Sequence, residues 1–174
     1  MMNPFKRSYT SEEINLFRFL SKIKLFEALN YGEMYEFVPN LYLRSYKQNE
    51  VVFFRQDPSN ALYIIKNGQI SLNMDVNGEF QPLTTIKSGE AFGDNALLPN
   101  AKRIYTSVVV SESADLYVIP QVNIEEVFLG TPKIKAKIMG SFAELYNMYT
   151  INIFKAYRSD FGFFDLAHAY RKED

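Results

Sequence analysis

The sequence contains no cysteine and no tryptophan, and its single histidine is His168, near the C-terminal end. The absence of cysteine excludes disulfides, thiolate catalysis and cysteine-ligated zinc or iron–sulfur sites. One histidine cannot supply the two or three imidazole ligands of a small β-barrel metal enzyme. No nucleophile is paired with a base either. We therefore expect no metal site, no prosthetic group and no catalytic residues, and a chain that is not an enzyme.

Neither sign of charge is in excess, because the sequence contains 19 Lys and Arg residues and 20 Asp and Glu residues. A net charge of -1 lacks the basic surplus that is typical of binding to nucleic acid or anionic membranes. No run of 18 apolar residues occurs, and residues 1–8 lack the apolar stretch of a secretory signal. We expect a cytoplasmic protein with no membrane partner.

The composition is otherwise that of a globular domain, with 47% hydrophobic and 22% charged residues in 174. This length favours one domain with appended helices. The patterning predicts three zones: a helical segment over 1–40, a strand-rich segment over 41–120, and helices with a tail over 121–174.

The first zone carries helix signals. Thr10-x-x-Glu13 has the form of a capping box, in which side chains satisfy the free amides of the first turn. Apolar residues then follow at helical spacing: Ile14, Phe17, Leu20, Ile23 and Phe26. A second, short helix is predicted between Asn30 and Pro39.

The middle zone contains short runs rich in Val, Ile, Tyr and Phe, separated by turn residues. The runs are Val51–Phe54, Leu62–Ile65, Ile70–Met74, Ser107–Val110 and Leu116–Ile119. Asn77-Gly78, between two such regions, is the strongest hairpin signal in the chain. The pattern predicts an antiparallel sandwich, roll or barrel.

The last zone is predicted to be helical again. A short helix over Val122–Leu129 ends at Gly130, and a longer one begins at Pro132 and runs to about Arg158. Its apolar stripe is wider than a β-roll needs, so part of it is expected to face a partner chain. Its aromatic residues are expected to be core or dimer contacts: Tyr146, Tyr149, Phe154 and Tyr157.

Three stretches resemble the cyclic-nucleotide-binding domain family, which includes catabolite-activator-type regulators, regulatory subunits of cAMP-dependent kinase and nucleotide-gated channels. Residues 19–26 resemble its first helix, and residues 57–68 its signature strand and turn. Residues 89–98, followed by Arg103-Ile104-Tyr105-Thr106, resemble its phosphate-binding cassette, with the same nine-residue separation between Asp94 and Arg103. The resemblance implies an α+β, mainly β fold: an antiparallel β-roll (double-stranded β-helix or jelly roll) over 41–120, with the cassette at about 89–106, N-terminal helices and a long C-terminal helix.

The resemblance also implies a ligand site. Backbone amides beginning at Gly93 and the planar fork of Arg103 suit a cyclic phosphate, and Asp94 suits the ribose 2′-hydroxyl. The implied set for phosphate, ribose and adenine is Gly93, Asp94, Asn95, Ala96, Arg103, Ile104, Tyr105, Thr106, Leu72 and Leu83.

Several residues depart from the family pattern. Asp94 replaces Glu, Asn95 replaces an apolar residue, and Gln56 replaces a turn glycine, which predicts an altered turn. Ile104 and Tyr105 replace two small residues. The Tyr105 ring either fills the phosphate site, points away from it or stacks on a purine.

Two functions remain open. One is a sensor that binds cAMP or cGMP and signals to a protein partner through its C-terminal helix, dimerising through residues 132–158. The other is a ligand-free scaffold for protein interaction or dimerisation. Direct DNA binding is not expected, because only residues 159–174 follow the helix and few of them are basic.

Overall fold

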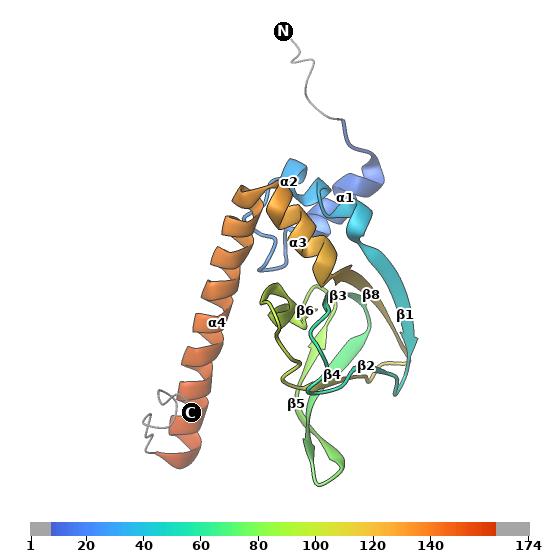
Figure 1. The fold of residues 1–174 in the computed structure, drawn as a ribbon. Coiled ribbons are helices and arrows are strands. Elements are labelled where there is room, and N and C mark those ends of the chain that lie inside the picture. The colour runs from blue at the N-terminus through green and yellow to red at the C-terminus, as the bar shows by residue number, and fades with distance from the viewer. Residues whose placement is uncertain (1–7, 163–174) are drawn as a thin grey trace.

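The structure, a computed structural model, describes residues 8–162. Its centre is a roll of two four-stranded antiparallel sheets (Figure 1). One sheet has the strand order β1 (Tyr42–Lys47), β8 (Ser113–Pro120), β3 (Ala61–Asn67) and β6 (Ala91–Phe92). The other has the order β2 (Val51–Phe53), β7 (Thr106–Val109), β4 (Gln69–Val76) and β5 (Glu79–Lys87). The predicted α+β fold with an antiparallel β-roll is confirmed.

The N-terminal helices begin at two capping boxes. In α1 (Ser11–Leu20), the Glu13 amide donates to Thr10 Oγ1 at 3.1 Å, and the Thr10 amide donates to Glu13 Oε2 at 2.8 Å. Asn30 and Glu33 make the same pair of bonds at the start of α2 (Tyr31–Tyr35). The helix predicted up to Pro39 ends earlier, and Pro39 lies inside the 3₁₀ helix η1 (Val38–Asn40).

The C-terminal helices are α3 (Gln121–Gly130) and α4 (Pro132–Phe161), close to the predicted bounds. Ile134, Ile138 and Phe142, in the N-terminal half of α4, are buried in a core shared with α1, α2 and α3. An ion pair of 2.6 Å between Lys137 and Glu33 joins α4 to α2. Beyond this core α4 runs alongside the roll (Figure 1), so one helix connects the helical end of the molecule with the strands.

The five predicted strand runs fall on β2, β3, β4, β7 and β8. The β4–β5 hairpin turns at Asn77 and Gly78, whose φ angles are 54° and 83°, as the Asn-Gly signal predicts. The register shifts in this pair: Leu72 lies opposite Thr84, and Asn73 opposite Pro82. This bulge leaves Leu83 without an opposite residue and determines which β5 side chains face the roll.

The turn at Gln56 keeps the left-handed conformation that favours glycine, with φ 72°, so the expectation of an altered backbone there is wrong. The Gln56 amide donates to the Arg103 carbonyl at 2.9 Å, and the Arg103 amide donates to the Asp57 carbonyl at 2.8 Å. These two bonds connect the β2–β3 turn to the cassette segment just before β7.

Candidate ligand-binding site

The cassette begins at a left-handed glycine. Gly93 has φ 68° and joins β6 to the 3₁₀ helix η2 (Asp94–Leu97). A Cβ atom at this position would lie 2.4 Å from Nη1 of Arg103. Both the backbone angle and the close approach of the guanidinium therefore require glycine here.

Arg103 is 3% exposed, and its guanidinium bonds to the backbone. Nη1 donates to the Gly93 carbonyl at 2.9 Å, and Nη2 donates to the Ala61 carbonyl at 2.7 Å. The guanidinium carbon lies 4.1 Å from the centroid of the Phe53 ring, a cation–π contact. Burial lowers the pKa of Arg103 from its ordinary value. The side chain thus connects the cassette to β3, and its Nε is buried without a hydrogen-bond partner.

The Tyr105 ring lies beside the cassette, and its hydroxyl accepts the Gly93 amide hydrogen at 3.1 Å. The ring also contacts Phe53, with centroids 5.8 Å apart. Burial, and then the charge of Asp94, raise the pKa of the Tyr105 hydroxyl, so it is neutral at pH 7. The ring therefore lies against the cassette and does not point away from it.

A cavity of about 420 Å³ lies between the roll and α4. Its volume is within the range of small-molecule sites. Three parts of the chain line it: the cassette region, the β4–β5 pair and the C-terminal half of α4. The lining residues are Leu72, Thr84, Ile86, Glu90, Ala91, Phe92, Asp94, Ile104, Tyr105, Tyr146, Tyr149, Thr150 and Ile153.

Four of the ten residues implied by the resemblance line this cavity: Leu72, Asp94, Ile104 and Tyr105. Leu83, expected against the base, is 58% exposed and lies outside it. The β-bulge explains this placement, because it puts Thr84 opposite Leu72 and leaves Thr84 and Ile86 to form the wall.

The other implied residues hold the cassette in place. Asn95 accepts a bond of 2.8 Å from the Ser59 hydroxyl and donates to the Lys102 carbonyl. The Ala96 carbonyl accepts from the Gln121 side chain at 2.9 Å. Thr106 Oγ1 donates to Asp75 at 3.2 Å and accepts the Arg55 amide hydrogen at 3.0 Å. None of Asn95, Ala96 and Thr106 is among the lining residues.

Two α4 tyrosines, Tyr146 and Tyr149, belong to the cavity wall. Tyr146 also packs against the core beside Phe142, as the sequence predicts, so the role in the cavity wall is an addition to that prediction. The Tyr146 hydroxyl is 3.5 Å from Asp94 Oδ1, a long hydrogen bond, and Tyr149 lies one turn further along. Burial, followed by the charge of Asp94, raises the pKa of both hydroxyls. The sequence carried a signal for this placement, because Tyr146, Tyr149 and Ile153 occur at helical spacing on the same face as the buried Phe142.

The cavity has an acidic lining. Asp94 is 8% exposed, and burial raises the pKa of its carboxyl group against the hydrogen bonds that favour the charged form. Glu90 also lines the cavity, whereas no lysine or arginine does among residues 8–162. A phosphate in the cavity as it stands would therefore meet carboxylates and tyrosine hydroxyls, with the Arg103 guanidinium outside the lining.

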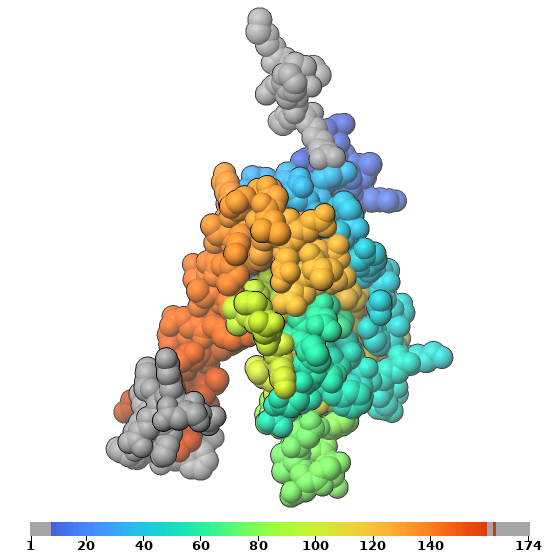
Figure 2. Space-filling view, in the orientation of Figure 1, coloured from blue at the N-terminus to red at the C-terminus, as the bar shows by residue number. Residues whose placement is uncertain are grey.

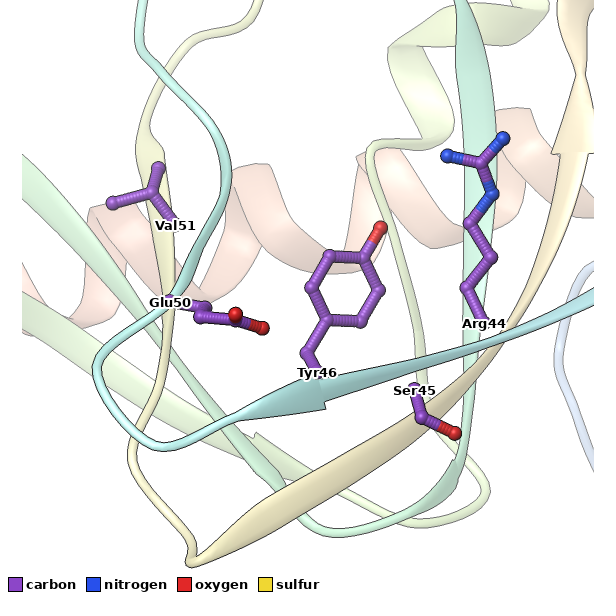
Figure 3. A pocket seen from close by; sticks show the side chains of 5 residues that line it. All are labelled: Arg44, Ser45, Tyr46, Glu50 and Val51. Atoms are coloured by element: carbon purple, nitrogen blue, oxygen red, sulfur yellow. The ribbon is translucent and has the colours of Figure 1, made fainter.

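A second hollow, of about 520 Å³, lies where β1 turns into β2 (Figure 3). Arg44 and Tyr46 extend from the same face of β1, and Glu50 and Val51 complete the wall. The hollow is shallow and contains no cassette residue, so we do not assign the ligand to it. Within residues 8–162, no three His, Cys, Asp or Glu side chains are placed to hold a metal ion. No helix in this range is long and apolar enough to cross a membrane.

Residues 43–130 match the sequence profile of the cyclic nucleotide-binding domain. The chain belongs to the cyclic nucleotide-binding domain family. This match contains the whole cassette with Gly93, Asp94 and Arg103, and it confirms the resemblance seen in the sequence.

Curated relatives are regulators and channels. The cAMP-dependent protein kinase regulatory subunit of Mycosarcoma maydis is 29% identical over 98 residues, which is 56% of this chain and 19% of that protein. The cyclic nucleotide-gated channel beta-3 of Mus musculus is 26% identical over 125 residues, or 71% of this chain and 18% of the channel. The chain thus spans about a fifth of the length of either relative.

A solved structure shows the same fold. The regulatory domain of Toxoplasma gondii PKA, crystallised with cAMP, superposes with a TM-score of 0.62 at 23% identity. The superposition covers 70% of this chain and 46% of that one. At this identity the likeness supports the fold alone.

Proposed function

We propose that this chain is a regulatory binding module, rather than an enzyme, that takes a cyclic nucleotide into the cavity between the cassette and α4. One observation carries the proposal: the same cavity is lined by the cassette residue Asp94 and by Tyr146, Tyr149 and Ile153 of α4. A ligand there contacts both the sensing loop and the helix that leads away from it. Occupancy can therefore shift the position of α4.

In this proposal the Asp94 carboxylate accepts a hydrogen bond from the ribose 2′-hydroxyl. The base lies between the apolar wall of Leu72 and Ile86 and the ring of Tyr149. The ligand then replaces the long Tyr146–Asp94 contact of 3.5 Å, which joins α4 directly to the cassette. We propose cAMP as the first ligand to test, with cGMP as the alternative.

The output is proposed to pass through α4 to a second copy of the chain or to another protein. Met148 and Ile151, in its C-terminal half, are 47% and 43% exposed, although they are large and apolar. Figure 2 shows that this half of α4 diverges from the β4–β5 hairpin and leaves a notch between them. The homodimer through residues 132–158 and the cytoplasmic location remain predictions.

A ligand-free scaffold is the second candidate, and the cassette itself favours it. The Gly93 amide donates to Tyr105, and two nitrogens of Arg103 donate to backbone carbonyls. Three of the donors that suit a phosphate are thus already satisfied by the protein.

Titration calorimetry of the intact chain with cAMP, 2′-deoxy-cAMP and cGMP separates the two candidates. We expect cAMP to bind about tenfold tighter than its 2′-deoxy analogue, because a carboxylate that loses its hydroxyl partner costs about 1–3 kcal/mol. Asp94→Ala is expected to abolish this preference, whereas Glu112→Ala, at an exposed acidic residue outside the cavity, keeps it. No binding of either nucleotide at millimolar concentration by the folded chain would leave the scaffold as the function.

A further inference from the structure

The donors that suit a cyclic phosphate are occupied by the protein's own groups, namely one side chain and two backbone carbonyls. Gly93 offers its amide, but Tyr105 Oη accepts it at 3.1 Å. Arg103 offers a planar fork, but its Nη1 and Nη2 donate to the carbonyls of Gly93 and Ala61. Three donors that an anion would use are therefore committed to internal acceptors.

We propose that Tyr105 is a resident occupant of the phosphate subsite and determines ligand preference: the resting cavity binds the nucleoside part of a ligand, and a phosphate gains its contacts only when Tyr105 leaves. This inference rests on the proposed function, because it concerns the same cavity. The resemblance places Tyr105 in the ligand set, and this inference gives it the further role of a specificity-determining residue.

The charges around the cavity support this preference. The carboxylates of Asp94 and Glu90 line the cavity, whereas Arg103 does not. A cyclic phosphate that entered without rearrangement would lose water and approach a like charge, both of which oppose binding. A nucleoside carries no charge, and its hydroxyls can donate to the same carboxylates.

The exchange itself has a structural basis. Tyr105 is only partly buried, and its neighbour Ile104 is 59% exposed, so the segment just before β7 reaches the surface. Arg103 Nε is a buried donor with no partner. When the tyrosine hydroxyl leaves, a phosphate oxygen can accept the freed Gly93 amide hydrogen, and the guanidinium has one donor unused. A buried charged group with an unmet donor favours the arrival of an anionic acceptor.

The test compares two ligands in four proteins: wild type, Tyr105→Ala, Tyr105→Phe and Tyr63→Phe. The readout is the ratio of the Kd of adenosine to the Kd of cAMP, measured by calorimetry. General damage to the cavity changes both affinities, whereas the ratio reports only the phosphate contribution. Tyr63→Phe is the matched control, because the Tyr63 ring also lies near Arg103, at 5.5 Å, but its hydroxyl does not bond to Gly93.

We expect a ratio within about threefold of one in wild type and in Tyr63→Phe. In Tyr105→Ala the ratio is expected to rise by at least about tenfold, a change of about 1.4 kcal/mol in favour of the phosphate. Tyr105→Phe keeps the ring and removes only the hydroxyl, so a smaller rise of the ratio is expected. This variant keeps the test valid if Tyr105→Ala does not fold.

An unchanged ratio in Tyr105→Ala and Tyr105→Phe, with cAMP bound by wild type, would overturn the role of Tyr105 and leave the proposed function standing. A wild-type protein that binds cAMP more than tenfold tighter than adenosine would also overturn the role of Tyr105 and leave the proposed function standing. Failure of all four proteins to bind cAMP would instead overturn the proposed function and this inference with it.

Discussion

At the scale of single residues, the position of the Arg103 guanidinium depends on the absence of a side chain at Gly93. Gly93→Ala places a methyl group 2.4 Å from Nη1 of Arg103 at a φ of 68°. We expect the free energy of unfolding to fall by about 2–4 kcal/mol, from left-handed strain plus the displaced guanidinium. Urea denaturation at pH 7 measures this.

Gly140→Ala is the matched control for that substitution. Gly140 lies inside α4, and an added Cβ would meet no atom within 4 Å. Alanine favours the helix, so the free energy of unfolding is expected to rise by up to about 1 kcal/mol. Equal stability of Gly93→Ala and wild type would contradict the role assigned to the Gly93–Arg103 contact.

The sequence predicted the identity of the cassette residues better than their contacts. Gly93, Asp94 and Arg103 were identified because residues 89–106 resemble the cassette of a known family, and that resemblance rests on a local stretch of sequence. The partner of Arg103 is the Ala61 carbonyl, 42 positions away, and backbone carbonyls leave no signature in a sequence. Leu83 lies outside the cavity because a one-residue bulge in the β4–β5 pair leaves it without an opposite residue, which the sequence did not indicate.

At the scale of elements, an ion pair between α2 and α4 makes stability depend on pH. Burial tends to raise the pKa of the Glu33 carboxyl, but the hydrogen bonds from Lys137 and the Asn30 amide outweigh it and lower the pKa below its ordinary value of 4.5. The unfolded chain therefore binds this proton first as the pH falls. The stabilisation is complete above about pH 4.5 and is lost as the pH falls from there through the lower pKa of the folded state.

Glu33→Gln is expected to lose stability at pH 7 and to show a smaller further loss than wild type between pH 6 and pH 3. Urea denaturation across this range measures both effects. Glu112→Gln, at an exposed carboxylate, provides the baseline for the rest of the acid dependence. Parallel curves for wild type and Glu33→Gln would contradict the assigned pKa.

The exposed face of α4 leads to a prediction about assembly. Ile151→Glu puts a charge on the apolar C-terminal half, where Ile151 is 43% exposed and does not line the cavity. We expect the dissociation constant of the dimer to rise by at least about tenfold, measured by analytical ultracentrifugation. Val122→Glu, at a 71% exposed residue of α3, should leave the equilibrium unchanged. A wild-type monomer at high concentration would contradict the dimer.

Elements with clear periodicity were predicted, and those without it were not. The capped helices and the Asn77-Gly78 hairpin follow from local rules. Strands β1 and β5 were not named as runs, because their side chains are largely exposed and show little apolar alternation. They are strands because of their pairing with β8 and β4, which is long-range information.

At the scale of the whole molecule, the roll and the helical end are joined by α4, which belongs to both. Its first half is core, and its second half is a wall of the cavity. The family and the roll could be predicted from the sequence, because the order of the motifs along the chain resembles that of the family. The shared cavity could not, because it depends on how close α4 packs to the cassette.

Hydrogen–deuterium exchange of the intact chain, with and without saturating cAMP, tests the central claim most directly. The account predicts changed exchange in two separate stretches, residues 91–106 of the cassette region and residues 146–153 of α4, which line one cavity. A change confined to the cassette, a change around residues 44–51 instead, or no change at millimolar cAMP would contradict a ligand shared by the cassette and α4.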